Sequence, residues 1–157
     1  MTPSSLDTYD RQLLVALQED ASRSAQELAA DVPLSVSAIQ RRIKRLRDEG
    51  VIERFVAVVD PAAVGGATMF LASLKLAREK PESAQRLREW IGQCVHVQQA
   101  YYVTGESDFV AVVCIDSVAA YESLMARLMA DNPDVLRYTT QVVLAPIKRG
   151  LGVPVAQ

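Results

Sequence analysis

The residues from Ser35 to Arg47 have the types and the spacing of a helix with two chemically different faces. Apolar side chains recur at helical spacing on one side, at Val36, Ile39, Ile43 and Leu46. The opposite side carries hydroxyl and cationic side chains, at Ser37, Arg41, Lys44 and Arg45. A helix that reads the major groove of double-stranded DNA needs such an apolar back and such a cationic, hydrogen-bonding front. A basic helix face that only meets solvent is the alternative interpretation.

The front of this helix supplies the candidate DNA-binding residues. Ser37, Arg41 and Lys44 are predicted to contact base edges or the adjacent phosphates. Gln40 lies nearer the rim and is a further candidate reader. Phosphate contacts release counterions from DNA and supply most of the affinity. The predicted phosphate contacts are Arg42, Arg45, Arg47 and Arg54, and Ser35, which caps the helix, completes the set.

The segment before this helix predicts two further helices and a turn. Asp7 can cap a first helix with a stripe of leucines, which ends near residue 20. Ser24 and Glu27 form a capping-box pattern that starts a short second helix. The turn spans residues 31–34, and Gly50 ends the third helix as a left-handed cap. Three helices, of which the last two are joined by a tight turn, predict a helix-turn-helix.

The pattern changes after the third helix. Residues 52–59 alternate as a strand would, which predicts either a wing or a strand that links onward. Residues 61–66 are the best linker candidate. We therefore predict a helix-turn-helix domain with its linking strand over 1–60, a linker over 61–66, and an effector-binding and oligomerisation domain over 67–157.

The second half of the chain predicts a ferredoxin-like βαββαβ domain, so the fold class is α+β. The predicted strands are 69–76, 95–104, 109–115 and 135–144, and the predicted helices are 81–93 and 117–130. Both helices would cover one face of an antiparallel sheet. The other face must be covered as well, and a second copy of the chain is the expected cover.

Charge is distributed unevenly along the chain, whose formal net charge is -2. Residues 35–54 hold six basic and three acidic side chains, a local charge of +3, so the remainder carries -5. This asymmetry is typical of a nucleic-acid-binding module joined to a module of another kind.

Other classes of site lack support in the sequence. Cys94 and Cys114 lie in apolar runs, which indicates buried thiols in a reducing compartment. We find no signal-peptide pattern and no apolar run long enough to span a bilayer, so a cytoplasmic location without a membrane partner is expected. His96 is the lone histidine and is expected to be structural, with no metal site. No catalytic residues and no cofactor are predicted.

Short motifs recur along nearly the whole chain. The first half contributes Leu6, Asp7, Asp10, Arg11, the run 27–29, the helix entry at 34–37, the run 41–46, the run 50–52, and Asp60 with Pro61. The second half contributes Val103-Thr104-Gly105-Glu106-Ser107-Asp108-Phe109 and the late run 142–144. With these motifs in this order, the chain resembles the Lrp/AsnC family of feast/famine, amino-acid-responsive transcription regulators. One departure is Pro33, where the family usually has glycine. Proline restricts its own φ and the residue before it, so the turn is expected to differ locally.

The resemblance implies a DNA-binding N-terminal domain and a C-terminal domain that binds an effector and forms oligomers. Family members form dimers that often assemble into octamers, and they bind amino acids or related metabolites at interfaces between subunits. A regulator whose assembly responds to such a small effector is therefore the predicted function.

The hairpin from Thr104 to Phe109 concentrates the polar chemistry of the second domain. The carboxylate of Asp108 suits an ammonium group, and exposed backbone N–H groups at a turn can hold a carboxylate. An α-amino acid carries both groups, which matches the expectation from the family. The candidate effector residues are Tyr101, Tyr102, Thr104, Gly105, Glu106, Ser107, Asp108, Thr140 and Val142. A plain hairpin whose polar residues meet water is the alternative.

Two other functions remain open. Some proteins that resemble this family in both domains are siroheme decarboxylases, which use basic and histidine side chains around a tetrapyrrole. The intact basic helix and the single histidine speak against that reaction. A ligand-binding assembly module with a vestigial DNA-binding domain is the other alternative, and it is weakened because the helix caps and the two-faced helix occur together.

Overall fold

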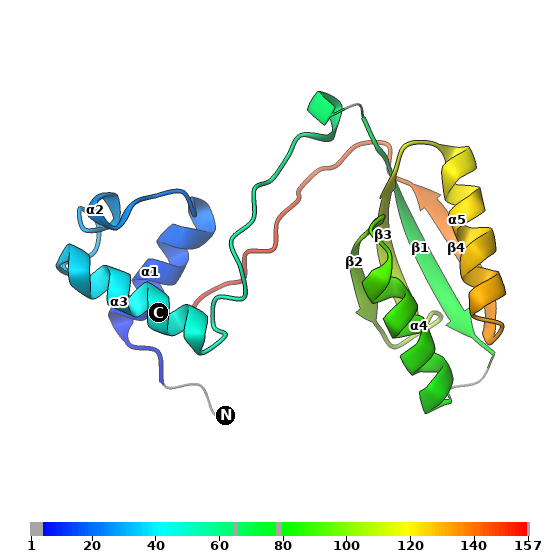
Figure 1. Ribbon diagram of the computed structural model, residues 1–157, viewed down its shortest axis with the longest axis horizontal. Helices are drawn as coiled ribbons and strands as arrows, with labels where there is room; N and C mark the ends of the chain where they lie inside the picture. Colours follow the sequence, from blue (N-terminus) through cyan, green and yellow to red (C-terminus); the bar gives the residue numbers. More distant parts are fainter. Residues whose placement is uncertain (1–4, 65, 78–79, 157) are drawn as a thin grey trace. The chain divides into compact units, whose positions relative to one another are not determined.

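The computed structural model describes residues 5–64, 66–77 and 80–156, and it separates the chain into two compact units (Figure 1). The first unit comprises Met1–Val58 together with Lys148–Gln157, and the second comprises Val59–Ile147. The predicted domain limits of 1–60, 61–66 and 67–157 stay a prediction. The two units differ from these limits at the C-terminal end, where the segment from Lys148 onward belongs to the first unit instead of the second.

Three helices form the body of the first unit: α1 (Thr8–Glu19), α2 (Ala25–Leu28) and α3 (Val36–Asp48). Their starts follow from local hydrogen bonds, as predicted. Asp7 and Ser24 each form a capping box, and the side chain of Ser35 accepts a hydrogen bond from the backbone of Ala38. Gly50 ends the helical segment with a φ of 73°, a left-handed conformation that glycine adopts without strain.

A small apolar core holds these helices together. Leu13 of α1, Leu28 of α2 and Ile39 of α3 are completely buried in it. Burying each such side chain contributes roughly 1.5–3 kcal/mol. The core therefore fixes which side of α3 faces inward, and the opposite side faces solvent.

The turn before α3 accommodates proline in the way the sequence requires. The backbone N–H of Leu34 donates to the carbonyl of Val32 over 2.7 Å, which closes a three-residue turn around Pro33. Within the described residues, positive φ angles occur only at Gly50, Gly66 and Gly105. This turn therefore does without the left-handed residue that glycine would favour.

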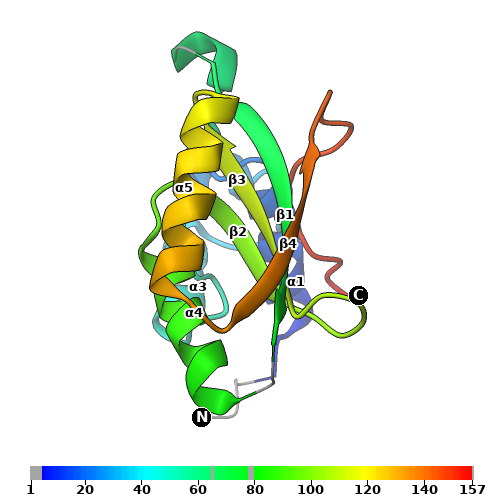
Figure 2. The ribbon, with the colours of Figure 1, turned by 90° about the vertical axis from the view of Figure 1, so that its right-hand side faces the viewer.

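The second unit is a four-stranded antiparallel sheet with both helices on one face (Figure 2). The sheet order is β2-β3-β1-β4. The elements are a 3₁₀ turn at Pro61–Val64, β1 (Thr68–Leu76), α4 (Pro81–Gln93), β2 (Val97–Tyr102), β3 (Phe109–Ile115), α5 (Val118–Asp131) and β4 (Val135–Val142). The βαββαβ order and the α+β fold class are confirmed.

The helices and the sheet enclose the main core. Leu87 of α4 and Met125 of α5 are buried against Phe70 and Leu74 of β1. Phe70 also stacks on Tyr121, with ring centroids 4.1 Å apart. Side chains alternate along β1 and β3, so every second residue points away from the helices and is only half-buried.

The predicted strand over 52–59 is wrong. Residues 51–60 are all described, and they form no strand. A strand needs a hydrogen-bonded neighbour, and no other segment of the described chain pairs with this one. The segment instead runs extended with its apolar side chains largely in solvent, as at Val58, which is 84% exposed. Neither a wing strand nor a linking strand therefore forms over residues 51–60.

Candidate DNA-binding and ligand-binding sites

The exposed side of α3 presents polar and basic side chains to solvent. These residues are Ser37, Gln40, Arg41, Lys44 and Arg47. Lys44 forms an i,i+4 ion pair with Asp48, with Nζ 2.5 Å from Oδ2, at a site where both side chains are largely exposed. Such a surface pair contributes little free energy, so Lys44 can exchange Asp48 for a phosphate. The Ser35 hydroxyl lies 3.2 Å from that of Ser37, at the helix entry.

Arg42 and Arg45 lie on the side of α3 that contacts α1. Asp10 of α1 is completely buried, and its carboxylate receives both guanidinium groups. Arg42 Nη1 lies 2.8 Å from Asp10 Oδ1, and Arg45 Nη2 lies 2.5 Å from Asp10 Oδ2. Arg42 Nη1 also lies 2.6 Å from Asp7 Oδ2. The hydrogen bond that Arg42 donates to Asp7 is the largest of the effects that raise the pKa of Arg42.

This cluster changes the interpretation of two predicted DNA contacts. Arg42 and Arg45 are both engaged with the buried carboxylate of Asp10, and turning either guanidinium toward a phosphate would cost it a charge-assisted hydrogen bond. The contacts of these two arginines hold α3 against α1, and their assignment as phosphate contacts stays a prediction. The sequence pattern placed Arg45 on the front of the helix because it took no account of where α1 packs.

Two further predicted phosphate contacts are Arg47, in the last turn of α3, and Arg54, after the helix. The guanidinium carbon of Arg47 lies 5.6 Å from the ring centre of Phe55, a cation–π contact. Arg54 is exposed in the extended segment after the helix. Both side chains are accessible to a phosphate.

Asp108 is not presented to a ligand in this structure. It is 3% exposed and lies at the base of the hairpin between β2 and β3. Its Oδ1 accepts a hydrogen bond from Lys75 Nζ over 2.8 Å, and its Oδ2 accepts one from the backbone of Leu76 over 2.7 Å. Burial raises the pKa of this carboxyl, but the two hydrogen bonds outweigh burial and leave the pKa lowered. The prediction that Asp108 holds the amino group of an effector is therefore not supported.

The rest of the hairpin is accessible. Gly105 has a φ of 118°, which favours glycine, and Thr104 and Glu106 are exposed beside it. Ser107 and Glu106 line a small hollow of about 40 Å³ on the uncovered face of the sheet. The other lining residues are Ser73, Lys75, Arg137 and Thr139.

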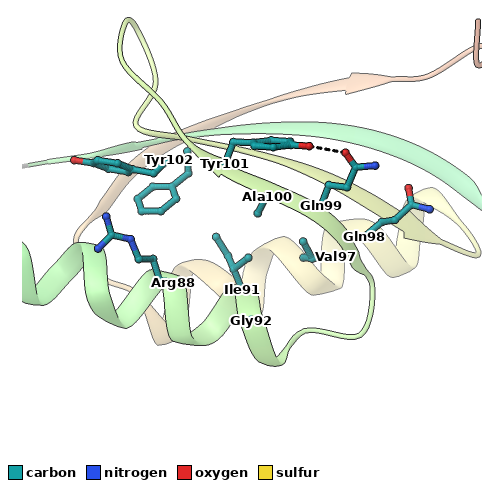
Figure 3. Close-up of a pocket in the computed structure, with 10 residues that line it drawn as sticks. Arg88, Ile91, Gly92, Val97, Gln98, Gln99, Ala100, Tyr101 and Tyr102 are labelled. Atoms are coloured by element: carbon teal, nitrogen blue, oxygen red, sulfur yellow. Dashed lines mark hydrogen bonds between the residues drawn. The ribbon is translucent and has the colours of Figure 1, made fainter. Parts of the chain in front are cut away.

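A larger groove of about 420 Å³ lies between α4 and the edge strand β2 (Figure 3). The guanidinium of Arg88 lies over the ring of Tyr102, with its carbon 4.8 Å from the ring centre. Tyr102 in turn packs against Phe109, with ring centroids 4.9 Å apart. The volume of the groove lies in the range of small-molecule sites, and the groove combines apolar walls with the cationic side chain of Arg88. Tyr101 and Tyr102 were predicted from the sequence, whereas Arg88, Gln98 and Gln99 were not.

Thr140 and Val142 lie away from this groove. They are on β4, which forms the opposite edge of the sheet from β2. The hydroxyl of Thr140 lies 2.8 Å from that of Tyr121, on the side of the sheet that the helices cover. A single chain therefore does not bring the predicted effector residues of β2 and β4 together. Arg88 was missed because one exposed arginine on an amphipathic helix carries no signal in the sequence.

The first unit is a DNA-binding domain of the helix-turn-helix class, and the second is an α+β domain with a groove of ligand size. Comparison with known proteins agrees: residues 6–47 match the AsnC-type helix-turn-helix domain, and residues 69–153 match the Lrp/AsnC ligand binding domain. The chain belongs to the Lrp/AsnC family of transcription regulators.

Relatives and solved structures match along most of the chain. An uncharacterized HTH-type transcriptional regulator of Sinorhizobium fredii is 37% identical over 150 residues, which are 96% of this chain and 89% of the relative. The regulator LrpA of Mycobacterium tuberculosis is 36% identical over 125 residues, 79% of this chain and 81% of that one. The crystal structure of an AsnC family regulator from Agrobacterium tumefaciens has a TM-score of 0.85 at 29% identity, and covers 95% of this chain and 97% of its own.

A structure of more distant sequence shares the fold. It is a transcriptional regulator from Neisseria meningitidis in complex with L-Met, with a TM-score of 0.85 at 23% identity, covering 96% of this chain and 97% of its own. The curated relatives bear names of transcriptional regulators, which favours regulation over the decarboxylase alternative. None of the helices in the described residues is long and apolar enough to cross a membrane.

Proposed function

We propose that this regulator reads double-stranded DNA with the exposed front of α3, through Ser37, Gln40, Arg41 and Lys44. The observation that carries this proposal is the division of α3 into two sets of cations. Arg42 and Arg45 are tied to Asp10, whereas Arg41 and Lys44 extend into solvent. A bidentate arginine–guanine pair contributes about 1–3 kcal/mol of discrimination. Arg47 and Arg54 would add phosphate contacts at the rim.

The test is competition binding on a duplex selected from genomic fragments by the purified protein. Arg41→Ala is expected to weaken the selected duplex about 5- to 100-fold and to flatten the preference over unrelated duplexes. Arg54→Ala is expected to weaken all duplexes equally and to reduce the salt dependence of binding. Arg86→Ala, at an exposed position of α4, is the matched control. Unchanged affinity and salt dependence for Arg41→Ala would exclude this face.

The effector is proposed to be an amino acid held in the groove between α4 and β2. Arg88 supplies a cation for a carboxylate, and the Tyr102 ring with Ile91 supplies apolar surface, whereas the Tyr101 ring lies on the side of β2 away from α4 (Figure 3). The turn 104–107 does not line this groove: its Glu106 and Ser107 line the hollow on the uncovered face, and its part in holding the effector stays a prediction from the sequence. The L-Met complex of the similarly folded Neisseria regulator supports an amino acid as the ligand. The amino group would need a partner other than Asp108.

Calorimetric titration with the protein amino acids, L-methionine included, tests this assignment. Tyr102→Ala and Arg88→Gln are expected to lower the affinity for the amino acid that binds the wild type. Gln85→Ala, on the exposed side of the same helix, is expected to leave it unchanged. If both Tyr102→Ala and Arg88→Gln bind the amino acid with the affinity of the wild type, the groove is not the effector site.

The uncovered sheet face is proposed to pack on a second copy of the chain. Half-buried apolar side chains at Met69, Leu71, Val110 and Val112 line it. Thr140 and Val142 point to the covered face, so this packing does not by itself bring them to the groove, and their part in effector binding stays a prediction from the sequence. Two helix-turn-helix units would then bind two half-sites, which compensates for the small surface of one unit.

A further inference from the structure

The last residues of the chain pack on α1 of the DNA-binding unit. The side-chain amide of Gln18 pairs with the backbone of Val153 in both directions. Gln18 Nε2 donates to the Val153 carbonyl over 3.1 Å, and the Val153 N–H donates to Gln18 Oε1 over 2.6 Å. Three residues further on, Arg11 Nη1 donates to the carbonyl of Ala156 over 2.7 Å. The tail is thus held at two points by one helix.

The geometry of α1 explains why these two residues act together. Arg11 and Gln18 are seven positions apart, which is close to two helical turns, so they share one face. That face is opposite the one that buries Leu13 in the core. An amide that donates to and accepts from the same residue reproduces the pairing of a β-ladder, and it fixes the direction of the tail. Gly152 lies against the Gln18 amide, where a Cβ would come 3.5 Å from Oε1.

The tail follows the sheet domain in the sequence but belongs to the DNA-binding unit. The chain leaves the DNA-binding unit at Val58, forms the sheet domain, and returns to the DNA-binding unit at Lys148. The DNA-binding unit is therefore joined to the sheet domain by two segments. A domain on one flexible linker samples many orientations, and a second attachment removes most of them.

We propose that the outer face of α1 is a docking surface for residues 150–156 of the same chain, and that this C-terminal clasp restrains the DNA-binding unit relative to the sheet domain. The clasp begins beyond β4, which carries Thr140 and Val142. It therefore forms a second mechanical connection between the sheet and the helix that supports α3. The inference rests on the proposed function only in its consequence, which is that restrained units tolerate fewer spacings between half-sites.

Amide hydrogen exchange in the full-length protein tests the docking directly. The Val153 amide is expected to be protected in the wild type and to exchange roughly five- to tenfold faster in Gln18→Ala, because a hydrogen bond to its acceptor is lost. Gln18→Glu keeps the acceptor and loses the donor, so it should release the tail in part. Gln12→Ala, at an exposed glutamine of the same helix, is the matched control. Wild-type exchange at the rate of an unstructured peptide would overturn the docking.

Nitrogen-15 relaxation of the amides of α1–α3 tests the restraint. Gln18→Ala and a truncation after Arg149 are expected to shorten the rotational correlation time of the DNA-binding unit, while Gln12→Ala leaves it unchanged. Equal correlation times in wild type and truncation would overturn the restraint. Both measurements are made without DNA or effector, so they stand whether or not the proposed DNA and amino-acid binding is found.

Discussion

Asp10 Oδ1 lies 2.8 Å from Arg42 Nη1, so a carboxylate in the first turns of the chain meets a cation 32 residues later on the recognition helix. The same carboxylate holds Arg45 through its second oxygen. Both contacts act on one side of α3, and the apolar core acts on the neighbouring side. Together they fix the rotation of α3 about its own axis, which determines that Ser37, Arg41 and Lys44 point outward.

Replacing Asp10 by asparagine is expected to destabilise the DNA-binding unit by about 2–3 kcal/mol, since hydrogen bonds to charged groups are worth about 1.5–3 kcal/mol each and the two arginines can partly reach water. Urea unfolding followed by circular dichroism measures the change. The control is Asp31→Asn, which breaks the exposed ion pair with Arg23 and should cost less than about 1 kcal/mol. Equal effects of the two substitutions would contradict the role assigned to Asp10.

Two glycines of the second unit should respond to alanine with opposite signs. Gly105 has a φ of 118°, so Gly105→Ala strains the backbone although open space surrounds it, and a loss of about 1–2 kcal/mol is expected. Gly92 lies in the last turn of α4 with no atom near its missing Cβ, so Gly92→Ala should stabilise by about 0.5–1 kcal/mol. Thermal unfolding of both variants measures these changes. A stabilised Gly105→Ala protein would show that the hairpin turn relaxes.

Local spacing was sufficient to predict most of the elements. The caps at Asp7, Ser24 and Ser35, and the proline at the start of α4, act within one helical turn, so the sequence determines them directly. The limits of α4 and β3 were predicted to the residue. The predicted β2 extended two residues too far at each end, and the predicted β4 two residues too far at its C-terminal end, because the extent of a strand depends on its pairing with a neighbour.

The candidate sites depended more on contacts between distant residues. Arg45 belongs to the front of α3 by spacing alone, and only the position of Asp10 assigns it to the flank. Asp108 is a free carboxylate in the sequence, and only the pairing of β3 with β1 brings Lys75 and Leu76 to it. The alternation over 52–59 predicts a strand, but a strand forms only where a partner is present.

The hydrogen bonds of Asp108 predict a pH dependence of stability. Because its pKa is lowered in the folded protein, the ionised form stabilises the fold at pH values above the ordinary value of 3.8. That contribution is lost as the pH falls through the lowered pKa. Asp108→Asn should therefore cost about 1.5–3 kcal/mol near neutral pH, and the difference from wild type should shrink below about pH 4.

Chemical denaturation of the two proteins across pH 3–7 measures this difference. Asp116→Asn, at an exposed position after β3, should stay within about 0.5 kcal/mol of wild type throughout. A constant gap between wild type and Asp108→Asn at every pH would mean that the carboxylate charge does not carry the effect.

Self-association through the uncovered sheet face would bring two DNA-binding units together, and a substitution on that face tests it. Val112 lies near the centre of this face, paired with Leu71 on one side and Gln99 on the other. Val112→Glu would bury a carboxylate in each copy of a two-sheet interface, at a desolvation cost that the unpaired charges cannot recover. The expected result in size-exclusion chromatography with light scattering is a lower oligomeric state than that of the wild type.

Ala119→Glu is the matched control for this substitution, because it adds the same charge at an exposed position of α5. It should leave the oligomeric state unchanged. If Val112→Glu associates like the wild type, the sheet face is not the interface. If it dissociates, DNA binding should weaken as well, because one helix-turn-helix unit then contacts a single half-site.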